Sequence, residues 1–292
     1  MFLSTRRATT VLALCGGLVF SPLSGAALAA PTSVLTSPAQ VADAPRLVSA
    51  DNFRDIAGTG AGYPAQGSHR LNKGVIYRSN ALTLSDADLA TVEGLRLAEV
   101  IDMRNDDEIA SAPDRVPAGA SYVNIQILAG DLAEQAGKLR SPEEARELLR
   151  SFNREFVTSP QAREGMAQTL TRIAEQPGPI VFHCTAGKDR TGWATYLLQS
   201  LVGVDSDTIM NDYLLTNEYS AASIEATVAH IAATRGPEAA AVIRPLLGVD
   251  RSFLEAGITQ LTSDYGTVDK YLRDGLGLRP QVVNALRAKL VK

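Results

Sequence analysis

Cys184 and Arg190 are the residues whose types and spacing most clearly indicate chemistry. They stand in the string HCTAGKDRTG, residues 183–192, with five residues between the cysteine and the arginine. A cysteine thiolate is a nucleophile, and a guanidinium can grip two oxygens of a phosphate at once. Gly187 and Gly192 allow the backbone to turn tightly and to approach a ligand. The string therefore predicts a thiolate facing the centre of a bound oxyanion, for which phosphate is the natural fit.

The segments on either side of the string predict how it is held. The apolar run at 180–184 indicates a buried strand, and the run at 191–203 indicates a helix with Gly203 at its C-terminal cap. The loop would then join the carboxyl end of a strand to the N-terminus of a helix, where α/β sheets place ligands. The free N–H groups and the dipole of that helix favour an anion, and Lys188 and Arg190 add positive charge, so the thiolate is favoured.

Strands and helices alternate along the rest of the chain. Ser85 and Asp88 indicate a helix start, and Pro177-Gly178-Pro179 a break. Further strands are expected at 75–78, 98–103 and 122–127, and helices at 85–95, 131–176 and throughout the chain after 190. This order predicts an α/β fold with a central, largely parallel sheet flanked by helices, on which the helical C-terminal third packs.

The first thirty residues differ from the rest. Arg6 and Arg7 precede an apolar stretch at 11–20, and Ala27-Leu28-Ala29 fits a signal for cleavage. We therefore expect a signal peptide at 1–30, a flexible leader at 31–45 and a single domain at 46–292. A membrane anchor is the alternative, but the apolar run is short for a span and Pro22 ends it. The expected location is secreted or periplasmic, with no stable membrane span in the mature chain.

Composition and cysteine content narrow the function further. The chain has 292 residues, 45% of them hydrophobic, and a net charge of −4, so it has no global attraction to nucleic acid. Cys15 would leave with the signal peptide. Cys184 would then be the one cysteine of the mature chain, unable to form an internal disulfide.

The spacing Cys-x5-Arg resembles the signature loop of the protein tyrosine phosphatase superfamily. The longer string HCTAGKDRTG is similar to that of the subgroup typified by mycobacterial protein tyrosine phosphatase B. Other matching pieces lie at 52–58, 75–80, 100–108, 211–217 and 265–277, so the resemblance spans most of the mature chain. It implies the cysteine phosphatase fold.

The resemblance also implies roles for the residues of the string. Cys184 would attack phosphorus and form a phosphocysteine intermediate, while Arg190 would hold the phosphoryl oxygens. Thr191 would donate a hydrogen bond to the cysteine sulfur and help it to leave. The substrate phosphate would lie against Thr185, Ala186, Gly187 and Lys188, with His183 orienting the loop from behind. No metal and no cofactor are expected.

The general acid has two candidates. Something must protonate the leaving oxygen, and the sequence lacks the Trp-Pro-Asp tripeptide that carries the acid in many relatives. The subgroup resemblance implies Asp189, whose place in the loop needs no motion to reach the leaving group. Asp102, at the end of a predicted strand, is the competing candidate. It would otherwise pair with an arginine and hold the loop in shape.

Several other residues keep two interpretations. Lys188 fits either tolerance of multiply phosphorylated lipid headgroups or a solvated lysine that assists the thiolate. For Arg54 with Asp55, and for Arg78, an ion pair near the site competes with substrate contact. The subgroup resemblance also implies a helical lid, placed at 218–247, for which plain packing on the core is the alternative.

These observations predict a secreted, cysteine-dependent phosphatase. Its expected substrates are phosphotyrosine proteins, with phosphoserine, phosphothreonine and phosphoinositide activity as further possibilities. A dedicated phosphoinositide phosphatase is the first alternative, and a non-catalytic phosphate-binding module the second. A sulfur-transfer or dithiol redox enzyme is disfavoured, because the mature chain has no partner cysteine.

Overall fold

A computed structural model describes residues 41–127 and 132–291, which lie in one compact unit that begins at Gln40. The predicted signal peptide and most of the leader lie outside the described residues. The strands are β1 Arg54–Asp55, β2 Ile76–Ser79, β3 Glu99–Asp102, β4 Ser121–Asn124 and β5 Ile180–His183. The helices are α1 Asp86–Glu93, α2 Asp106–Ser111, α3 Leu132–Lys138, α4 Pro142–Thr158, α5 Pro160–Glu175, α6 Asp189–Leu201, α7 Ser206–Tyr219, α8 Ala221–Arg235, α9 Pro237–Leu247, α10 Arg251–Tyr265, α11 Val268–Lys270, the π-helical turn η1 Tyr271–Gly275 and α12 Pro280–Leu290.

The strands form one sheet in the order β1-β2-β5-β3-β4. β1 pairs with β2 in antiparallel fashion, and the other pairs are parallel. The predicted largely parallel sheet is confirmed. The central strand β5 has Ser79 opposite His183 on one side and Asp102 opposite His183 on the other. The carboxyl ends of β2, β5 and β3 therefore meet at one edge, directly before Cys184.

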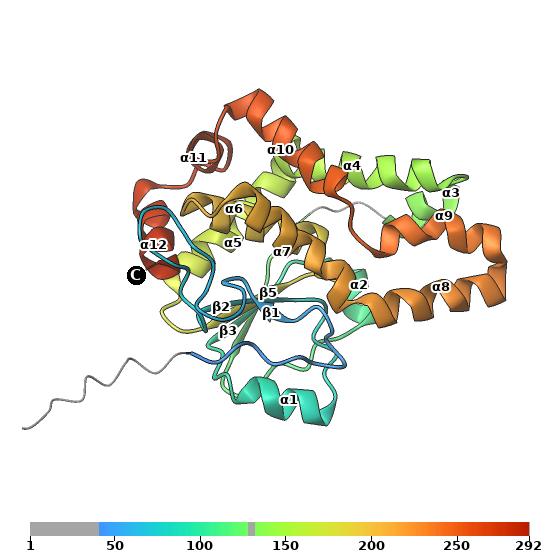
Figure 1. Cartoon of the computed structure of the whole chain (residues 1–292), viewed down its shortest axis with the longest axis horizontal. Coiled ribbons are helices and arrows are strands. Elements are labelled where there is room, and N and C mark those ends of the chain that lie inside the picture. Colours follow the sequence, from blue (N-terminus) through green and yellow to red (C-terminus); the bar gives the residue numbers. More distant parts are fainter. Residues whose placement is uncertain (1–40, 128–131, 292) are drawn as a thin grey trace, which may run out of the picture. The chain divides into compact units, whose positions relative to one another are not determined.

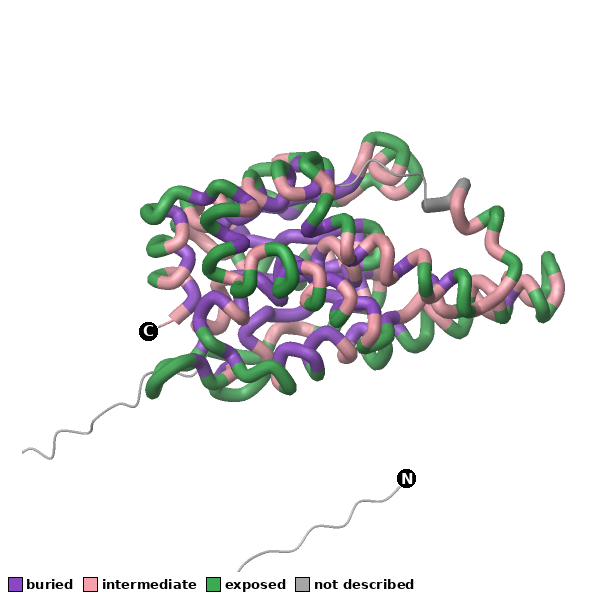
Figure 2. The backbone as a smooth tube through the Cα atoms, turned by 90° about the horizontal axis from the view of Figure 1, so that it is seen from above, coloured by how far each residue is buried: buried purple, intermediate pink, exposed green. Residues whose placement is uncertain are grey.

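The parallel strands β2, β3 and β5 are buried on both faces, as is usual for parallel strands, whereas the edge strand β4 is largely exposed. Ile180 and Phe182 of β5 belong to the larger core beneath α5, α6 and α12, whereas Val181 belongs to a smaller core that includes Val92 of α1. Figure 1 shows the same arrangement, with α1 on one face of the sheet and α5 and α6 on the other. Figure 2 shows the resulting buried interior. This packing fixes β5, and hence the start of the loop, from both sides.

The predicted helix start at Ser85 is also found, and two further serines begin helices in the same way. Ser85, Ser141 and Ser159 each cap a helix by accepting a backbone N–H, and proline follows the last two at the first helical position. Gly203 follows α6 with φ +72°, a left-handed conformation that suits glycine. Within the described ranges, no helix is both long and apolar enough to cross a membrane.

Two elements of the structure were not predicted from the sequence. β1 is a two-residue strand made of two charged residues, Arg54 and Asp55, both buried. α2 is six residues long and begins at a capping box between Asn105 and Glu108. Glu108 of α2 contacts the loop that begins at Cys184, and Asn52, two residues before β1, bonds to the same loop.

Candidate active site

The loop that begins at Cys184 lies where the sequence places it. β5 ends at His183, and α6 begins at Asp189, one residue before the arginine. Five residues, Cys184 to Lys188, therefore turn the chain from strand to helix. We call residues 184–190 the thiol loop.

The carbonyl oxygens of the thiol loop are bonded from outside. Asn52 Nδ2 donates to the oxygens of Ala186 and Gly187, each at 3.0 Å, and Ala81 N donates to that of Thr185 at 3.0 Å. Arg78 also donates to the Gly187 oxygen at 2.8 Å. Because a peptide N–H and its neighbouring C=O point in opposite directions, these contacts turn the loop amides toward its centre. Converging amides of this kind bind anions.

Gly187 is the residue that makes this turn possible. Its φ is +67°, in the left-handed region. A Cβ at this position would lie 2.4 Å from the Ser79 oxygen and 2.6 Å from Asn80 N. The loop therefore rests directly on the backbone at the end of β2, and only a residue without a side chain fits there.

Cys184 is 3% exposed and lies at the base of the loop. Thr191 Oγ1 donates to its Sγ at 3.3 Å, as the resemblance implied for this threonine. Thr191 lies in the first turn of α6, whose free backbone N–H groups also face the loop. The thiol thus has a hydroxyl donor on one side and the anion-binding amides on the other.

Arg190 is held by a carboxylate that the sequence did not reveal. Its two terminal nitrogens bond to the two oxygens of Glu108, at 2.8 and 2.5 Å. The same Glu108 Oε1 accepts from Thr185 Oγ1 at 2.5 Å. Glu108 therefore occupies the edge of the guanidinium that the two terminal nitrogens form. The other edge, formed by Nε and one terminal nitrogen, can bind two oxygens of a phosphate.

The Arg190–Glu108 pair is strongly charged. Burial opposes ionisation of Glu108, but the hydrogen bond and charge of Arg190 lower its pKa to about 2. Burial also disfavours the charged guanidinium, yet the negative charges of Cys184 and Glu108 raise the pKa of Arg190 above its ordinary value. A permanently charged arginine therefore lies beside the thiol.

Lys188 and Asp189 form a second ion pair in the loop. Lys188 Nζ lies 2.8 Å from Asp189 Oδ2, with side chains 5% and 17% exposed. The lysine is thus buried within the loop rather than solvated. Asp189 is the more accessible of the two candidate general acids.

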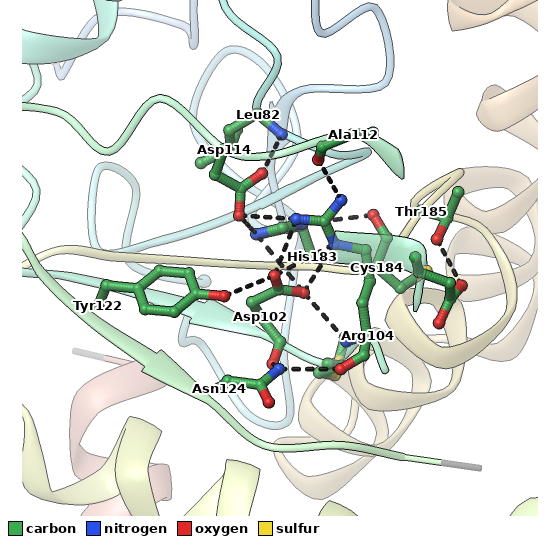
Figure 3. Close-up of polar contacts among 12 residues, drawn as sticks. Leu82, Asp102, Arg104, Ala112, Asp114, Tyr122, Asn124, His183, Cys184 and Thr185 are labelled. Atoms are coloured by element: carbon green, nitrogen blue, oxygen red, sulfur yellow. Dashed lines mark hydrogen bonds and ion pairs between the residues drawn. The ribbon is translucent and has the colours of Figure 1, made fainter. Parts of the chain in front are cut away.

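Asp102 lies behind the loop, in a buried network (Figure 3). Its carboxylate accepts three side-chain hydrogen bonds from Arg104, at 2.8 to 3.1 Å, and one from Tyr122 at 2.9 Å. Asp102 is fully buried. Both of its oxygens are engaged, and its partner is the arginine two residues on.

His183 joins this network to the cysteine. Its Nε2 lies 3.0 Å from Asp114 Oδ2, and its Nδ1 is 3.3 Å from the Cys184 oxygen. Asp102, Asp114 and His183 also cluster as metal ligands could. Arg104 lies 2.8 Å from Asp102 and 2.9 Å from Asp114. Its guanidinium therefore supplies the positive charge that a metal ion would bring to these two carboxylates.

Arg54 forms the structural ion pair that the sequence left open, but its partner is Asp212 of α7 rather than the neighbouring Asp55. Arg54 bonds to Asn52 and to Asp212 of α7, while the oxygens of Asp55 accept the amides of Ala57 and Gly74. Desolvation by burial raises the pKa of Asp55 to about 6. The two adjacent residues alternate across β1 and face different partners.

Four supporting residues were not singled out in the sequence: Asn52, Glu108, Asp114 and Asp212. All but Asp114 lie within the matching pieces at 52–58, 100–108 and 211–217. One local signal could have found Glu108, because Asn105 and Glu108 have the spacing of a capping box. The others meet the loop only through the tertiary fold. Asn52, for example, precedes its partner Gly187 by 135 positions.

The predicted lid region is helical. α8 and α9 form a hairpin, seen at the right of Figure 1, whose α9 places Leu246 in a small core with Leu149 of α4. No residue of α8 is buried. That the hairpin covers the thiol loop stays a prediction.

A family model described as the tyrosine phosphatase family matches residues 45–292, and the chain belongs to this family. It is 34% identical over 232 residues to a protein of Cupriavidus necator named as a tyrosine-protein phosphatase, covering 77% of this chain and 81% of that one. It is 30% identical over 284 residues to the triple specificity protein phosphatase PtpB of Mycobacterium tuberculosis, covering 84% and 98%. TpbA of P. aeruginosa is a more distant structural neighbour, at 17% identity and a TM-score of 0.31 over 70% of this chain and 88% of that one.

Family membership confirms the resemblance found in the sequence. It also confirms the expected class of enzyme, a protein-tyrosine phosphatase whose substrates are phosphorylated.

Proposed function

We propose that this chain is an exported, cysteine-dependent phosphatase that works through a phosphocysteine intermediate. The observation that carries the proposal is the thiol loop: its carbonyls are bonded outward, so its amides surround the space above Cys184. Arg190 adds a bidentate edge to that cradle. The arrangement suits a phosphoryl group whose phosphorus faces a sulfur nucleophile.

In the first step, the Cys184 thiolate forms a bond to phosphorus while the bond from phosphorus to the leaving oxygen breaks. Asp189 gives its proton to that oxygen. In the second step, water attacks phosphorus, Asp189 takes a proton from the water, and the S–P bond breaks. Thr191, 3.3 Å from Sγ, stabilises the departing thiolate. Arg190 and the loop amides hold the phosphoryl oxygens in both steps.

Asp189 is the proposed general acid rather than Asp102. The geometry supports this, because Asp102 is fully buried and its oxygens are occupied by Arg104 and Tyr122. Asp189 lies in the loop itself and is partly exposed. Asp102 would then orient His183 and Arg104 behind the cysteine.

Replacing Asp189 by asparagine should therefore slow turnover in a way that depends on the leaving group. We expect about a hundredfold loss of kcat with a phosphotyrosine peptide, whose phenol needs a proton. The loss should be much smaller with p-nitrophenyl phosphate, whose leaving group is a weaker base. Steady-state kinetics on both substrates would measure this. Equal losses on the two substrates would contradict the assignment.

The proposed substrates are phosphotyrosine proteins, with phosphoserine, phosphothreonine and phosphoinositides in addition. The family and the printed name of the mycobacterial relative support a broad range. Lys188, buried in the loop and paired with Asp189, supports phosphoinositides as a second candidate class, since a further cation suits a multiply phosphorylated headgroup. Export to a secreted or periplasmic location is part of the proposal and rests on the pattern of residues 1–30.

Phosphate release by the purified full chain, with a chelator present, tests the function. The substrates are p-nitrophenyl phosphate, a phosphotyrosine peptide, a phosphoserine peptide and soluble phosphoinositides. We expect turnover without added metal and the fastest release from phosphotyrosine. Faster release from the lipids would make the phosphoinositide phosphatase the better description. Phosphate binding without release on any of them would favour the non-catalytic module.

A further inference from the structure

Four buried residues from three distant segments support the thiol loop from below. They are Asn52, Arg54, Arg78 and Asp212, none of them more than 3% exposed. We call these four residues the brace. The Asp212 carboxylate of α7 is its centre, 3.3 Å from an Arg78 terminal nitrogen and 3.6 Å from Arg54 Nε.

Two arms run from Asp212 to the same part of the loop. In one arm, Arg78 donates to the Gly187 oxygen at 2.8 Å. In the other, Arg54 donates to Asn52 Oδ1 at 2.5 Å, and Asn52 Nδ2 donates to the Ala186 and Gly187 oxygens. These are the contacts that turn the loop amides inward. Asp212 touches no loop atom in these contacts and acts through the two arginines.

The brace has a surplus of positive charge. Two buried guanidinium groups share one carboxylate, whose Oδ1 also accepts from Tyr63 at 3.3 Å. A buried charge without a counterion is costly. Burial and repulsion by Arg54 lower the pKa of Arg78 to about 9, and the negative charges of Asp212 and Cys184 oppose this by raising it. An anion at Cys184 would therefore compensate the surplus.

We infer that the brace is a positioning unit for catalysis: it holds the Ala186 and Gly187 carbonyls outward, and its surplus positive charge favours the thiolate of Cys184. This inference rests on the proposed function, in which that thiolate is the nucleophile. It assigns Arg78, for which the sequence left an ion pair and substrate contact open, to the support of the reaction, together with Asp212.

Other titratable groups also lie around the loop. They are His183 with the carboxylates behind it, Glu108, Lys188, Asp189, Arg190 and the buried Tyr213. Substitutions within the brace leave all of these in place. A difference between two brace variants therefore reports the charge of the brace itself.

The test measures thiolate formation without any substrate. The full chain is alkylated with iodoacetamide across a pH series, and the peptide carrying Cys184 is quantified by mass spectrometry. Arg78→Gln removes a positive charge and should move the alkylation midpoint up by about one pH unit. Asp212→Asn removes a negative charge and should move it down. General damage to the loop would move both midpoints upward, because it removes the amides that stabilise the anion.

Arg78→Lys separates position from charge. It keeps the cation but cannot reach both Asp212 and the Gly187 oxygen in a fork. We expect an alkylation midpoint close to that of the wild type and a kcat about tenfold lower. If Arg78→Gln does not fold, as judged by thermal unfolding, Asp212→Asn and Arg78→Lys carry the test.

Glu99→Gln is the matched control. Glu99 is fully buried and accepts two bonds of 2.7 Å from Arg172, at the end of β3 away from the loop. Its loss breaks an ion pair between a buried carboxylate and a half-exposed arginine, and should leave the midpoint unchanged. The inference would be overturned if the midpoints of Arg78→Gln and Asp212→Asn moved in the same direction, or if neither moved. A chain that shows the opposite shifts but releases no phosphate would instead refute the proposed function.

Discussion

Replacing Cys184 by serine should abolish turnover while substrate binding persists. A serine hydroxyl is not ionised near neutral pH, so the loop would hold a poor nucleophile. We expect kcat for p-nitrophenyl phosphate to fall by about four orders of magnitude or more. The loop amides, Arg190 and Glu108 are untouched by this change. A phosphotyrosine peptide should therefore still bind, with an affinity measurable by calorimetry.

The chain offers a matched control for this variant. Cys15 is the other cysteine of the sequence and lies in the predicted signal peptide. Cys15→Ser should leave kcat and KM unchanged. If Cys184→Ser retained turnover within tenfold of the wild type, a cysteine nucleophile would be refuted.

Replacing Gly187 by alanine should damage both stability and activity. The left-handed φ of +67° is unfavourable for alanine, and the new Cβ would lie 2.4 Å from the Ser79 oxygen. That atom belongs to the backbone of the central sheet, which cannot move aside as a flexible side chain could. We expect the free energy of unfolding to fall by roughly 3 kcal/mol, and kcat by about a hundredfold as the amides are displaced. Urea unfolding and steady-state kinetics would measure the two losses.

Gly119→Ala separates the two causes. Gly119 also has a left-handed φ, +84°, but a Cβ there would meet nothing within 4 Å. It should cost only about 1 kcal/mol of backbone strain and leave kcat unchanged. If Gly187→Ala were no more harmful than Gly119→Ala, the close contact between the loop and β2 would not matter.

The thiol loop and its flanking elements could be predicted because their signals are local. IVFH forms β5 and DRTGWATYLLQSL forms α6, as the apolar patterns indicate. β1 could not be predicted, because its residues Arg54 and Asp55 are charged and would ordinarily be exposed. Their burial depends on partners elsewhere in the fold: Asp212 follows Arg54 by 158 positions.

The site residues divide in the same way, into those found from a local string and those whose partners are distant in the sequence. Cys184, Arg190 and Thr191 follow from one short string, and the structure brings them together. Glu108 could have been proposed only as a helix cap, since its partner Arg190 is 82 positions away. The sequence left Asp102 open between acid catalysis and pairing with an arginine. In the structure Arg104, two residues after the end of β3, donates hydrogen bonds to the Asp102 carboxylate.

The wide sequence separation of the supporting contacts bears on how the protein folds. The loop carbonyls are bonded by Asn52, Arg78 and Ala81, each more than 100 positions before the loop. Contacts between such distant segments form late, because closing long loops costs chain entropy. A chain refolding from denaturant would therefore hold the cysteine long before it holds the cradle around it. Enzyme activity would be the last property to return, and it would report completion of the fold more faithfully than helix content.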